Sequence, residues 1–343
     1  MTANTTGQKK VILDVKNMVK YFPIRAGVFK RVVGHVQAVD DITFHVFEGE
    51  TFGLVGESGC GKTTAGMTLL RLYNATSGSA YLNNIEMDEN IEGMEGVDLL
   101  RLKGSRLRKL RKHVQMIFQD PYSSLNPRMR VKNIIAEGMK THGLIKGKSD
   151  EIDKVAAIMK KVGLSVDHMY RFPHEFSGGQ RQRIGIARAL GVEPDLVVCD
   201  EAVSALDVSI QAQVVNLLKE LQTELKLTYI FIAHDLAVVK HISDRIGVMY
   251  LGKIVEMTDK NSLFDSPLHP YTRALISAIP IPDPEHDKKR IILEGDVPSP
   301  INPPSGCRFH TRCPIAKKIC SEEEPIFEEK APGHFVACHF TDK

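Results

Sequence analysis

The chain has 343 residues, enough for one large domain or two smaller ones with a well-packed core. Its 45 basic and 42 acidic residues leave a net charge of +3, so composition gives no argument for nucleic-acid binding and we expect no nucleic-acid partner. No run approaches the roughly 18 apolar residues of a membrane span, and the polar N-terminus does not read as a secretory signal. We expect a cytoplasmic protein whose membrane association is peripheral.

Alternating apolar residues predict two strands at the start of the chain, over residues 11–15 and 39–46. Between them lie the aromatic pair Tyr21-Phe22 and a predicted loop over residues 23–34. An aromatic side chain here could stack on a purine ring or pack in the core at a strand end. The local sequence favours packing in the core.

A glycine-rich loop lies between an apolar strand, predicted over residues 51–55, and a helix predicted over residues 63–72. It matches the P-loop pattern G-x-x-x-x-G-K-[ST], in which glycines let backbone N–H groups and a helix N-terminus face a polyphosphate. Lys62 can reach the β- and γ-phosphates, and the Thr63 hydroxyl can coordinate Mg²⁺. The joint pattern argues against a chance turn. We predict a nucleoside triphosphate site formed by Gly56, Glu57, Ser58, Gly59, Cys60, Gly61, Lys62, Thr63 and Thr64.

The next stretch is harder to interpret. Residues 84–98 are acidic and interrupted by glycines, and residues 101–112 then carry seven basic side chains and no acidic one. The basic cluster could bind phospholipid or nucleic acid. We favour the solvated face of a helix, because Leu102, Leu107 and Leu110 can point inward.

A long helical segment follows, with no strand predicted between residues 131 and 190. Ser149 is predicted to cap one helix, which ends at Gly163. The alternation of strands and helices elsewhere predicts an α/β sheet into which this segment is inserted as a helical lobe. A second glycine-rich helix start lies near its end, formed by Ser177, Gly178, Gly179 and Gln180.

Four polar side chains each come directly after a predicted strand, and so are expected at one edge of a parallel sheet. Asp200 occupies the position of an acid that holds Mg²⁺, and Glu201 beside it can orient or deprotonate an attacking water. Gln119 and His234 can reach the γ-phosphate or that water. Each residue alone has a structural explanation, such as a helix cap for an acid. Their order after a P-loop predicts triphosphate hydrolysis.

Together these motifs resemble the nucleotide-binding subunits of ABC transporters over roughly residues 10–260. The serine-glycine-glycine-glutamine signature is the specific part, because P-loop kinases and GTPases lack it. The resemblance implies an α/β P-loop NTPase fold with an ABC-type nucleotide-binding domain over residues 10–265. A helical subdomain is inserted at about residues 128–190, and a Cys-rich C-terminal extension covers residues 266–343.

The resemblance also implies what the predicted site residues do. Lys62 and the loop amides would hold the phosphates of ATP, Glu201 would be the general base, and His234 would fix the γ-phosphate and the water. Phe22 matches the adenine-stacking aromatic of the family, which reverses the local interpretation, with Tyr21 as the adjacent alternative. Gln119 also joins the catalytic group, and the implied Mg²⁺ ligands are Thr63, Gln119 and Asp200.

In this family, two subunits clamp two ATP molecules head to tail. The signature residues, Ser177 to Gln180, would complete the partner's site in trans, with a helix N-terminus again meeting phosphate. Asp207, predicted to cap the helix after the Asp200 strand, would carry contact between the two sites. ATP touches both halves only when they are closed, so binding favours closure and hydrolysis releases it.

Several motifs narrow the resemblance to the dipeptide/oligopeptide importer ATPases: Gly56–Lys62, Phe118–Pro127, Phe176–Arg183, His269–Thr272 and Cys307–Pro314. Ala202 and Phe176 depart from the family's usual proline and leucine without removing a catalytic group. The resemblance implies a second, related ATPase in a heterodimer, two integral membrane permease subunits and an extracytoplasmic peptide-binding protein, with this subunit on the cytoplasmic face of the membrane. Nickel or glutathione as cargo, and a soluble ABC-type ATPase, are the alternatives.

The C-terminal extension is rich in proline and ends in four cysteines with the spacing C-x5-C-x6-C-x17-C: Cys307, Cys313, Cys320 and Cys338. A cytoplasmic location makes disulfides unfavourable and favours a metal site. The spacing alone leaves zinc and an iron–sulfur cluster open, because structural zinc usually shows tighter pairs. The resemblance implies a 4Fe-4S cluster.

Overall fold

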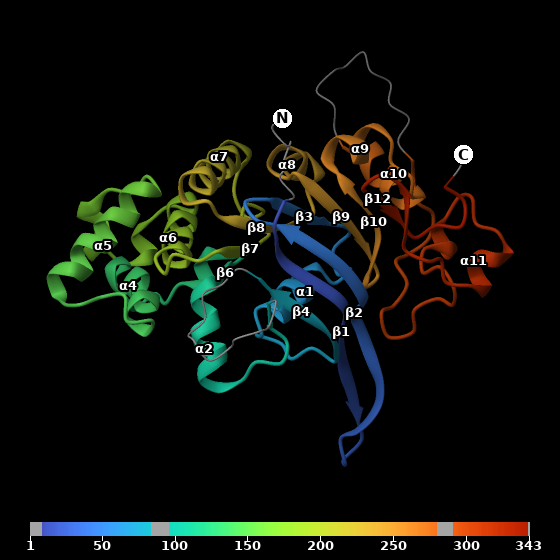
Figure 1. Cartoon of the computed structure of the whole chain (residues 1–343), viewed down its shortest axis with the longest axis horizontal. Helices are drawn as coiled ribbons and strands as arrows, with labels where there is room; N and C mark the ends of the chain where they lie inside the picture. Colours follow the sequence, from blue (N-terminus) through green and yellow to red (C-terminus); the bar gives the residue numbers. More distant parts are fainter. Residues whose placement is uncertain (1–8, 84–95, 280–290, 342–343) are drawn as a thin grey trace, which may run out of the picture.

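The computed structural model describes residues 9–83, 96–279 and 291–341, and the statements below concern those residues. Its larger sheet has the order β11-β12-β10-β9-β3-β8-β7-β6. These strands are β3 (Thr51–Val55), β6 (Val114–Ile117), β7 (Leu196–Asp200), β8 (Thr228–Ala233), β9 (Arg245–Tyr250), β10 (Lys253–Asp259), β11 (Glu328–Ala331) and β12 (His334–Val336). Strands β9, β3, β8, β7 and β6 are parallel to their neighbours within this group, as the alternating pattern predicts (Figure 1).

Helices flank this sheet and form a separate lobe beside it. They are α1 (Lys62–Leu69), α2 (Gly104–His113), α3 (Pro121–Ser124), α4 (Val131–Thr141), α5 (Lys148–Lys161), α6 (Gly178–Leu190), α7 (Val208–Leu225), α8 (Leu236–Ile242), α9 (Lys260–Asp265), α10 (Pro270–Ser277) and α11 (Lys318–Glu322). Short 3-10 helices cover Val166–Tyr170, Pro173–Glu175 and His310–Arg312. No helix in the described ranges is long and apolar enough to cross a membrane.

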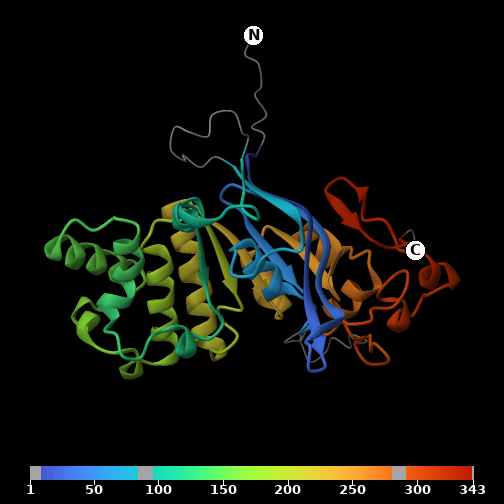
Figure 2. The same ribbon diagram turned by 90° about the horizontal axis from the view of Figure 1, so that it is seen from below.

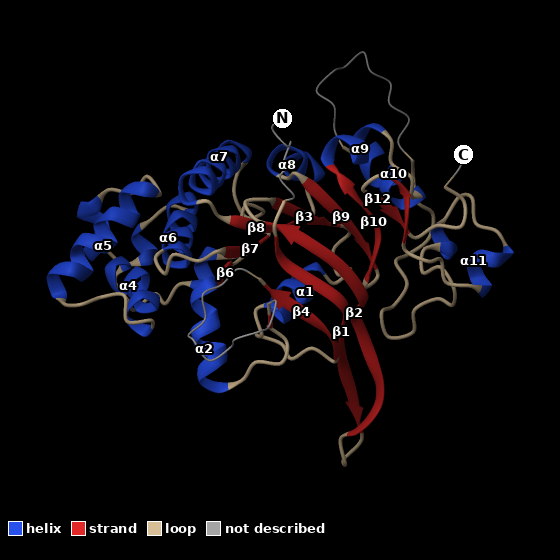
Figure 3. Ribbon diagram, in the orientation of Figure 1, coloured by secondary structure: helices blue, strands red, loops and turns tan. Residues whose placement is uncertain are grey.

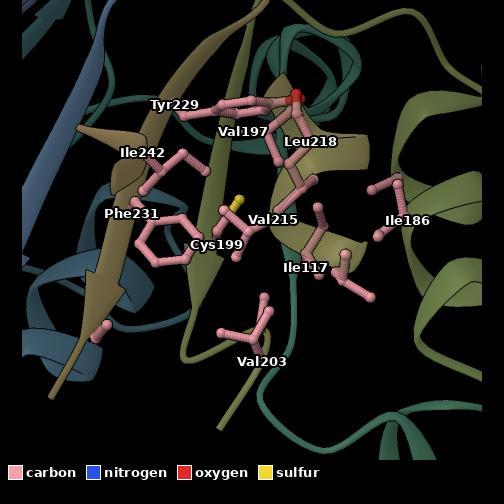
Figure 4. Close-up of a cluster of buried hydrophobic side chains, with 14 of the residues drawn as sticks. Ile117, Ile186, Val197, Cys199, Val203, Val215, Leu218, Tyr229, Phe231 and Ile242 are labelled. Carbon is pink, nitrogen blue, oxygen red and sulfur yellow. The ribbon is translucent and has the colours of Figure 1, made fainter. Parts of the chain in front are cut away.

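Both faces of the sheet are buried at its central strands β3, β7 and β8. Tyr229 and Phe231 of β8 pack in one core cluster, together with residues of α7 and α8. Ile230 and Ile232 point to the opposite face and join the cluster that contains Leu69 of α1. This burial on two faces explains the nearly continuous apolar runs of the parallel strands. Figure 4 shows part of the first cluster, where side chains from β7, β8 and α7 meet those of Ile117 and Ile186.

A second sheet of four strands has the order β2-β1-β4-β5, formed by β1 (Val11–Ala26), β2 (Arg31–Phe47), β4 (Ser77–Leu82) and β5 (Val97–Asp98). Strands β1 and β2 form a long hairpin (Figure 3). The loop predicted over residues 23–34 is therefore wrong except for its tip, which turns at Gly27 with φ of 74°. Pro23 is tolerated in β1 because β4 pairs only up to Val19, leaving that edge free.

Between β6 and β7 the chain forms a helical lobe, made mainly of α4, α5 and α6, which projects from one end of the sheet (Figure 2). The predicted cap at Ser149 is wrong, because α5 begins at Lys148. The Asp150 carboxylate accepts the N–H of Lys146 at 2.7 Å, and so satisfies a backbone donor just before the helix. On this helix Val155 is buried, whereas Ile152 is 38% exposed.

The basic segment before β6 forms α2. Leu110 is buried and Leu107 is partly buried, whereas Arg106 and Arg108 beside them are exposed. This agrees with the interpretation as a solvated helix face. The acidic segment of residues 84–98 lies mostly outside the described residues.

The C-terminal extension continues the larger sheet. Strand β12 pairs antiparallel with β10, where Glu256 lies opposite Val336, and β11 adds one more strand at the edge. The buried Glu256 carboxylate contacts His334 at 2.7 Å and accepts the N–H of Leu268 at the same distance. The extension is thus attached through backbone pairing and a buried polar network. The domain boundary at residue 266 stays a prediction.

Candidate active site

The P-loop connects a fully buried strand, β3, to the helix α1. Two of its glycines are required by close packing. Gly56 has φ of 152°, and a Cβ there would lie 2.1 Å from the Met249 carbonyl oxygen. Gly61 has φ of 109°, and a Cβ there would lie 2.0 Å from the Ala38 carbonyl oxygen. Since side chains at both positions would collide with backbone, the fold holds this loop in one shape.

The loop borders a cavity of about 250 Å³. Lys62 is 4% exposed, and its Nζ donates to the carbonyl oxygens of Gly56 at 2.8 Å and Glu57 at 2.9 Å. These bonds fix the ammonium group beside the loop. The residues that line the cavity are Val36, Ala38, Ser58, Gly59, Gly61, Lys62, Thr63, Thr64, Gln119, Glu201 and Pro300. Cys60 is buried and does not line the cavity, and Glu57, whose carboxylate contacts Arg312, does not line it either.

A hydroxyl and a carboxylate meet at the end of the loop. The Thr63 hydroxyl donates to the Asp200 carboxylate at 2.8 Å. Burial raises the pKa of Asp200, while the bond from Thr63 opposes that rise. Hydroxyl and carboxylate oxygens are the hard donors that Mg²⁺ prefers, so this pair fits a magnesium ion that also binds phosphate.

The other strand-end residues meet beside the same cavity: Gln119 and Glu201 line it, and His234 lines a smaller pocket that also includes Glu201. The Gln119 amide donates to the Glu201 carboxylate at 2.8 Å, and His234 Nδ1 lies 3.3 Å from the same oxygen. Glu201 has φ of 44°, a left-handed conformation that is uncommon for a residue with a side chain. Such strain persists where surrounding structure imposes it, and it is frequent at functional sites. The structure therefore brings together three residues that are far apart in the sequence.

The signature residues lie elsewhere. Ser177 is the N-cap of α6 and forms a capping box with Gln180. Ser177 and Gly178 are exposed, and none of the four signature residues lines the P-loop cavity. Asp207 caps α7 by accepting the N–H of Ile210 at 3.0 Å, as predicted, and does not line that cavity either.

The β1–β2 register distinguishes the two aromatic candidates. Phe22 lies opposite Val36, a residue of the cavity wall, so both belong to the same face of the hairpin. The Tyr21 hydroxyl instead hydrogen-bonds Asp40. The Phe22 ring packs edge-on against Tyr73, with centroids 5.2 Å apart. The geometry favours Phe22 over Tyr21 as the aromatic on the nucleotide side.

Three residues near the P-loop had no role in the sequence analysis, and all belong to the C-terminal part of the chain. Pro300 lines the cavity, and its carbonyl accepts the N–H of Gln37 at 2.9 Å. Tyr271 and Arg312 contact Glu57. Tyr271 and Arg312 lie within motifs that carried the family resemblance, which was the available signal, although no local pattern indicates what they contact.

The four cysteines of the extension are free thiols. Cys307 and Cys320 are joined by a backbone hydrogen bond of 2.8 Å. Burial, together with the neighbouring thiols, raises the pKa of Cys307 to about 11. In the described parts of the chain, however, no three His, Cys, Asp or Glu side chains are grouped in a way that could hold a metal ion. The arrangement does not support the expected cluster.

Comparison with known proteins agrees with this geometry. The sequence model of the ABC transporter family matches residues 39–204, and that of the oligopeptide/dipeptide transporter C-terminal region matches residues 255–320. The oligopeptide transport ATP-binding protein AppF of Bacillus subtilis (strain 168) is 54% identical over 338 residues, covering 98% of this chain and 99% of that protein. The chain belongs to the ABC transporter family of ATP-binding proteins.

Within that family, the chain falls among the oligopeptide transport ATP-binding proteins. OppF of Salmonella typhimurium is 53% identical over 336 residues, covering 96% of each chain. Among solved structures, the dimeric post-hydrolysis state of the ATP-binding cassette MJ0796 with ADP and Pi matches with a TM-score of 0.60 and 24% identity, covering 72% of this chain and 98% of that one. The predicted fold class of the nucleotide-binding domain is confirmed.

Proposed function

We propose that this chain is the ATP-hydrolysing subunit of an importer that takes up di- or oligopeptides across the cytoplasmic membrane. One observation carries the proposal: Gln119 and His234 both contact the carboxylate of Glu201, which lines the P-loop cavity. The full-length match to oligopeptide transport ATP-binding proteins supports peptide as the cargo. Nickel or glutathione transport, and a soluble ATPase, have no observation in their favour.

We assign a task to each residue of the proposed site. Lys62 and the loop N–H groups bind the phosphates of ATP. Thr63, Gln119 and Asp200 would hold Mg²⁺, which when bound would neutralise charge on the phosphates. Glu201 accepts the proton of the attacking water, and His234 orients that water and the γ-phosphate. Phe22 stacks on the adenine ring.

Replacing Glu201 tests this assignment. In Glu201→Gln, the side chain keeps its shape and loses its basicity, so hydrolysis should fall by about 100-fold or more while ATP still binds. Steady-state phosphate release and equilibrium binding of ATP measure the two effects. Hydrolysis at the wild-type rate would remove Glu201 as the base.

The signature residues act on a second subunit. Ser177 and Gly178 are exposed at a helix N-terminus, where backbone N–H groups attract phosphate. We place them against the ATP of a facing ATPase, with Asp207 at the contact between the two sites. The natural partner is a second, related ATPase in a heterodimer.

The remaining partners are two integral permease subunits and an extracytoplasmic peptide-binding protein, which put this subunit on the cytoplasmic face of the membrane. Tyr122, 70% exposed in the short helix α3 after Gln119, lies beside Arg181 of the helical lobe, and we assign this surface to the permease. Co-purification with integral membrane proteins tests this assignment. A chain recovered only from the soluble fraction, without permeases, would favour the soluble ATPase.

We also propose that the four cysteines hold a 4Fe-4S cluster, with zinc as the alternative. Their free thiols and the contact between Cys307 and Cys320 support a shared site, while the present arrangement does not group them around one ion. Anaerobic purification should yield brown protein that contains iron. A colourless preparation with stoichiometric zinc would replace the cluster by zinc, and a metal-free preparation would remove both.

A further inference from the structure

Glu57, the second residue of the P-loop, is held at three points. Its N–H donates to the Tyr271 hydroxyl at 2.8 Å. Its carboxylate accepts two hydrogen bonds from the Arg312 guanidinium, at 2.8 and 3.2 Å. Its carbonyl accepts the Lys62 ammonium at 2.9 Å. The residue that orients Lys62 is therefore itself held by two side chains from the C-terminal part of the chain.

The two side chains that hold Glu57 are themselves fixed. Tyr271 is 0% exposed, and its ring packs against Tyr250 and Phe309 with centroids 4.8 and 5.5 Å away. The Arg312 side chain is 8% exposed, and its guanidinium lies 6.0 Å from the Tyr250 ring. Neither side chain can readily follow Glu57 if the loop shifts, because Tyr271 is packed among aromatic rings and the Arg312 side chain is buried.

This arrangement gives the extension a direct hold on the phosphate site. A two-pronged Arg–carboxylate contact is strong and fixes orientation as well as distance. Binding groups such as the loop amides and Lys62 must stay within about 0.5 Å of their working positions. If Glu57 is released, its carbonyl oxygen, which accepts the hydrogen bond from Lys62, is free to move. Within the described residues, Gln119, Glu201 and His234 contact neither of the two side chains that hold Glu57.

We propose that Arg312 and Tyr271 are positioning residues which hold the P-loop through Glu57, so that the C-terminal extension sets the affinity of this subunit for ATP. This inference rests on the proposed function of the P-loop as the ATP site. It concerns ground-state binding of ATP, because the contacts of Arg312 and Tyr271 with Glu57 act on the phosphate-binding loop and not on the general base.

The test uses the full-length chain and a fluorescent ATP analogue. Arg312→Gln should raise the dissociation constant and the KM for ATP by about tenfold, which corresponds to about 1.4 kcal/mol. Its kcat should change by less than about twofold. Arg312→Lys keeps the positive charge but cannot form the paired guanidinium hydrogen bonds to the carboxylate, so it should recover only part of the affinity for ATP. Tyr271→Phe, which leaves the Glu57 N–H without its acceptor, should weaken binding by a smaller factor.

A matched control separates positioning from stability. Arg308 is also a buried arginine of the extension, but it contacts Asp40, Gln37 and the Leu251 carbonyl instead of the P-loop. Arg308→Gln should lower the unfolding temperature and leave the KM for ATP unchanged. An equal rise in KM in both variants would reduce Arg312 to a structural role and overturn the proposal.

A double-mutant cycle provides a second measurement. If the two groups act as one contact, Glu57→Gln combined with Arg312→Gln should weaken ATP binding no more than either change alone. If the two losses of ATP affinity add up in the double variant, Glu57 and Arg312 do not act through their mutual contact. If Arg312→Gln does not fold, Glu57→Gln and Arg312→Lys carry the same test. If the wild-type chain does not bind ATP, the proposed function is wrong. If the wild-type chain binds ATP and Arg312→Gln binds it with the same affinity, only this inference is wrong.

Discussion

The P-loop and the signature loop are both glycine-rich helix starts, yet the structure treats them differently. The P-loop is enclosed by its own chain: Gly56 and Gly61 pack against backbone carbonyls, and the loop lines a cavity. In the signature loop, Ser177 and Gly178 are exposed, and a Cβ on Gly178 would meet only a Leu206 methyl at 3.7 Å. The P-loop is shaped by contacts within its own subunit, whereas the signature loop is left open, as the proposed contact with a second subunit requires.

This comparison predicts that changes in the two loops separate ATP binding from subunit pairing. Lys62→Ala should weaken ATP binding by the isolated chain by about 100-fold, because it removes a charged hydrogen-bond donor to phosphate. Equilibrium titration with ATP measures the effect. Near-normal affinity would mean that the P-loop is not the principal phosphate site.

Ser177→Arg, in the signature loop, should affect subunit pairing. The exposed site tolerates a large side chain, so ATP binding by the isolated chain should change by less than about twofold. In the Glu201→Gln background, ATP-dependent pairing with the related ATPase should fall by about tenfold or more, because a bulky side chain occupies the interface. Sedimentation with and without ATP reports pairing. Unchanged pairing would remove the signature loop from the interface.

Matched glycine substitutions sharpen the contrast in stability. Gly61→Ala should lower the free energy of unfolding by about 2 kcal/mol or more, because the position combines positive φ with a backbone collision. Gly178→Ala, at the first position of α6, should change it by less than about 0.5 kcal/mol. Denaturant unfolding of both variants tests this difference. Equal costs would show that the two loops are equally constrained.

The smallest expected effect is a pH dependence at the P-loop. The pKa of Asp200 is raised by burial, so the folded protein binds this proton more tightly than the unfolded chain does. In EDTA, the Asp200 contribution to stability should therefore rise as pH falls through the folded pKa, and Asp200→Asn should lack that contribution. Unfolding temperatures of both proteins between about pH 7 and pH 4 measure the difference. Parallel curves would contradict the assignment.

The P-loop, its preceding strand and the strand-end residues could be predicted from the sequence because their signals are local. The apolar run before the loop corresponds to β3, which starts and ends where predicted. The strand-end positions of Gln119 and Glu201 placed them at one edge of a parallel sheet, where they form a hydrogen bond. Burial on both faces of a parallel sheet produces patterns that a short window detects.

What could not be predicted depends on contacts between distant segments. Tyr271 and Arg312 are 214 and 255 residues from Glu57, and nothing near them indicates the P-loop. The β1–β2 hairpin was missed because Pro23 and Gly27 resemble a loop, whereas pairing along the full length of β2 extends both strands. The cysteine spacing indicated a metal site, but the spacing does not encode how the segments come together in space.

The distance between Ser177 and the opposing P-loop in a closed pair decides whether the two subunits share their ATP sites. One cysteine is introduced as Ser177→Cys, and a second is placed in the P-loop of the facing ATPase. Cross-linking between these two cysteines is then measured with and without ATP in the Glu201→Gln background. If the signature loop meets the opposing P-loop, a cross-link should form with ATP and be lost without it. ATP-loaded pairs in which Ser177 stays far from the opposing P-loop would contradict this contact.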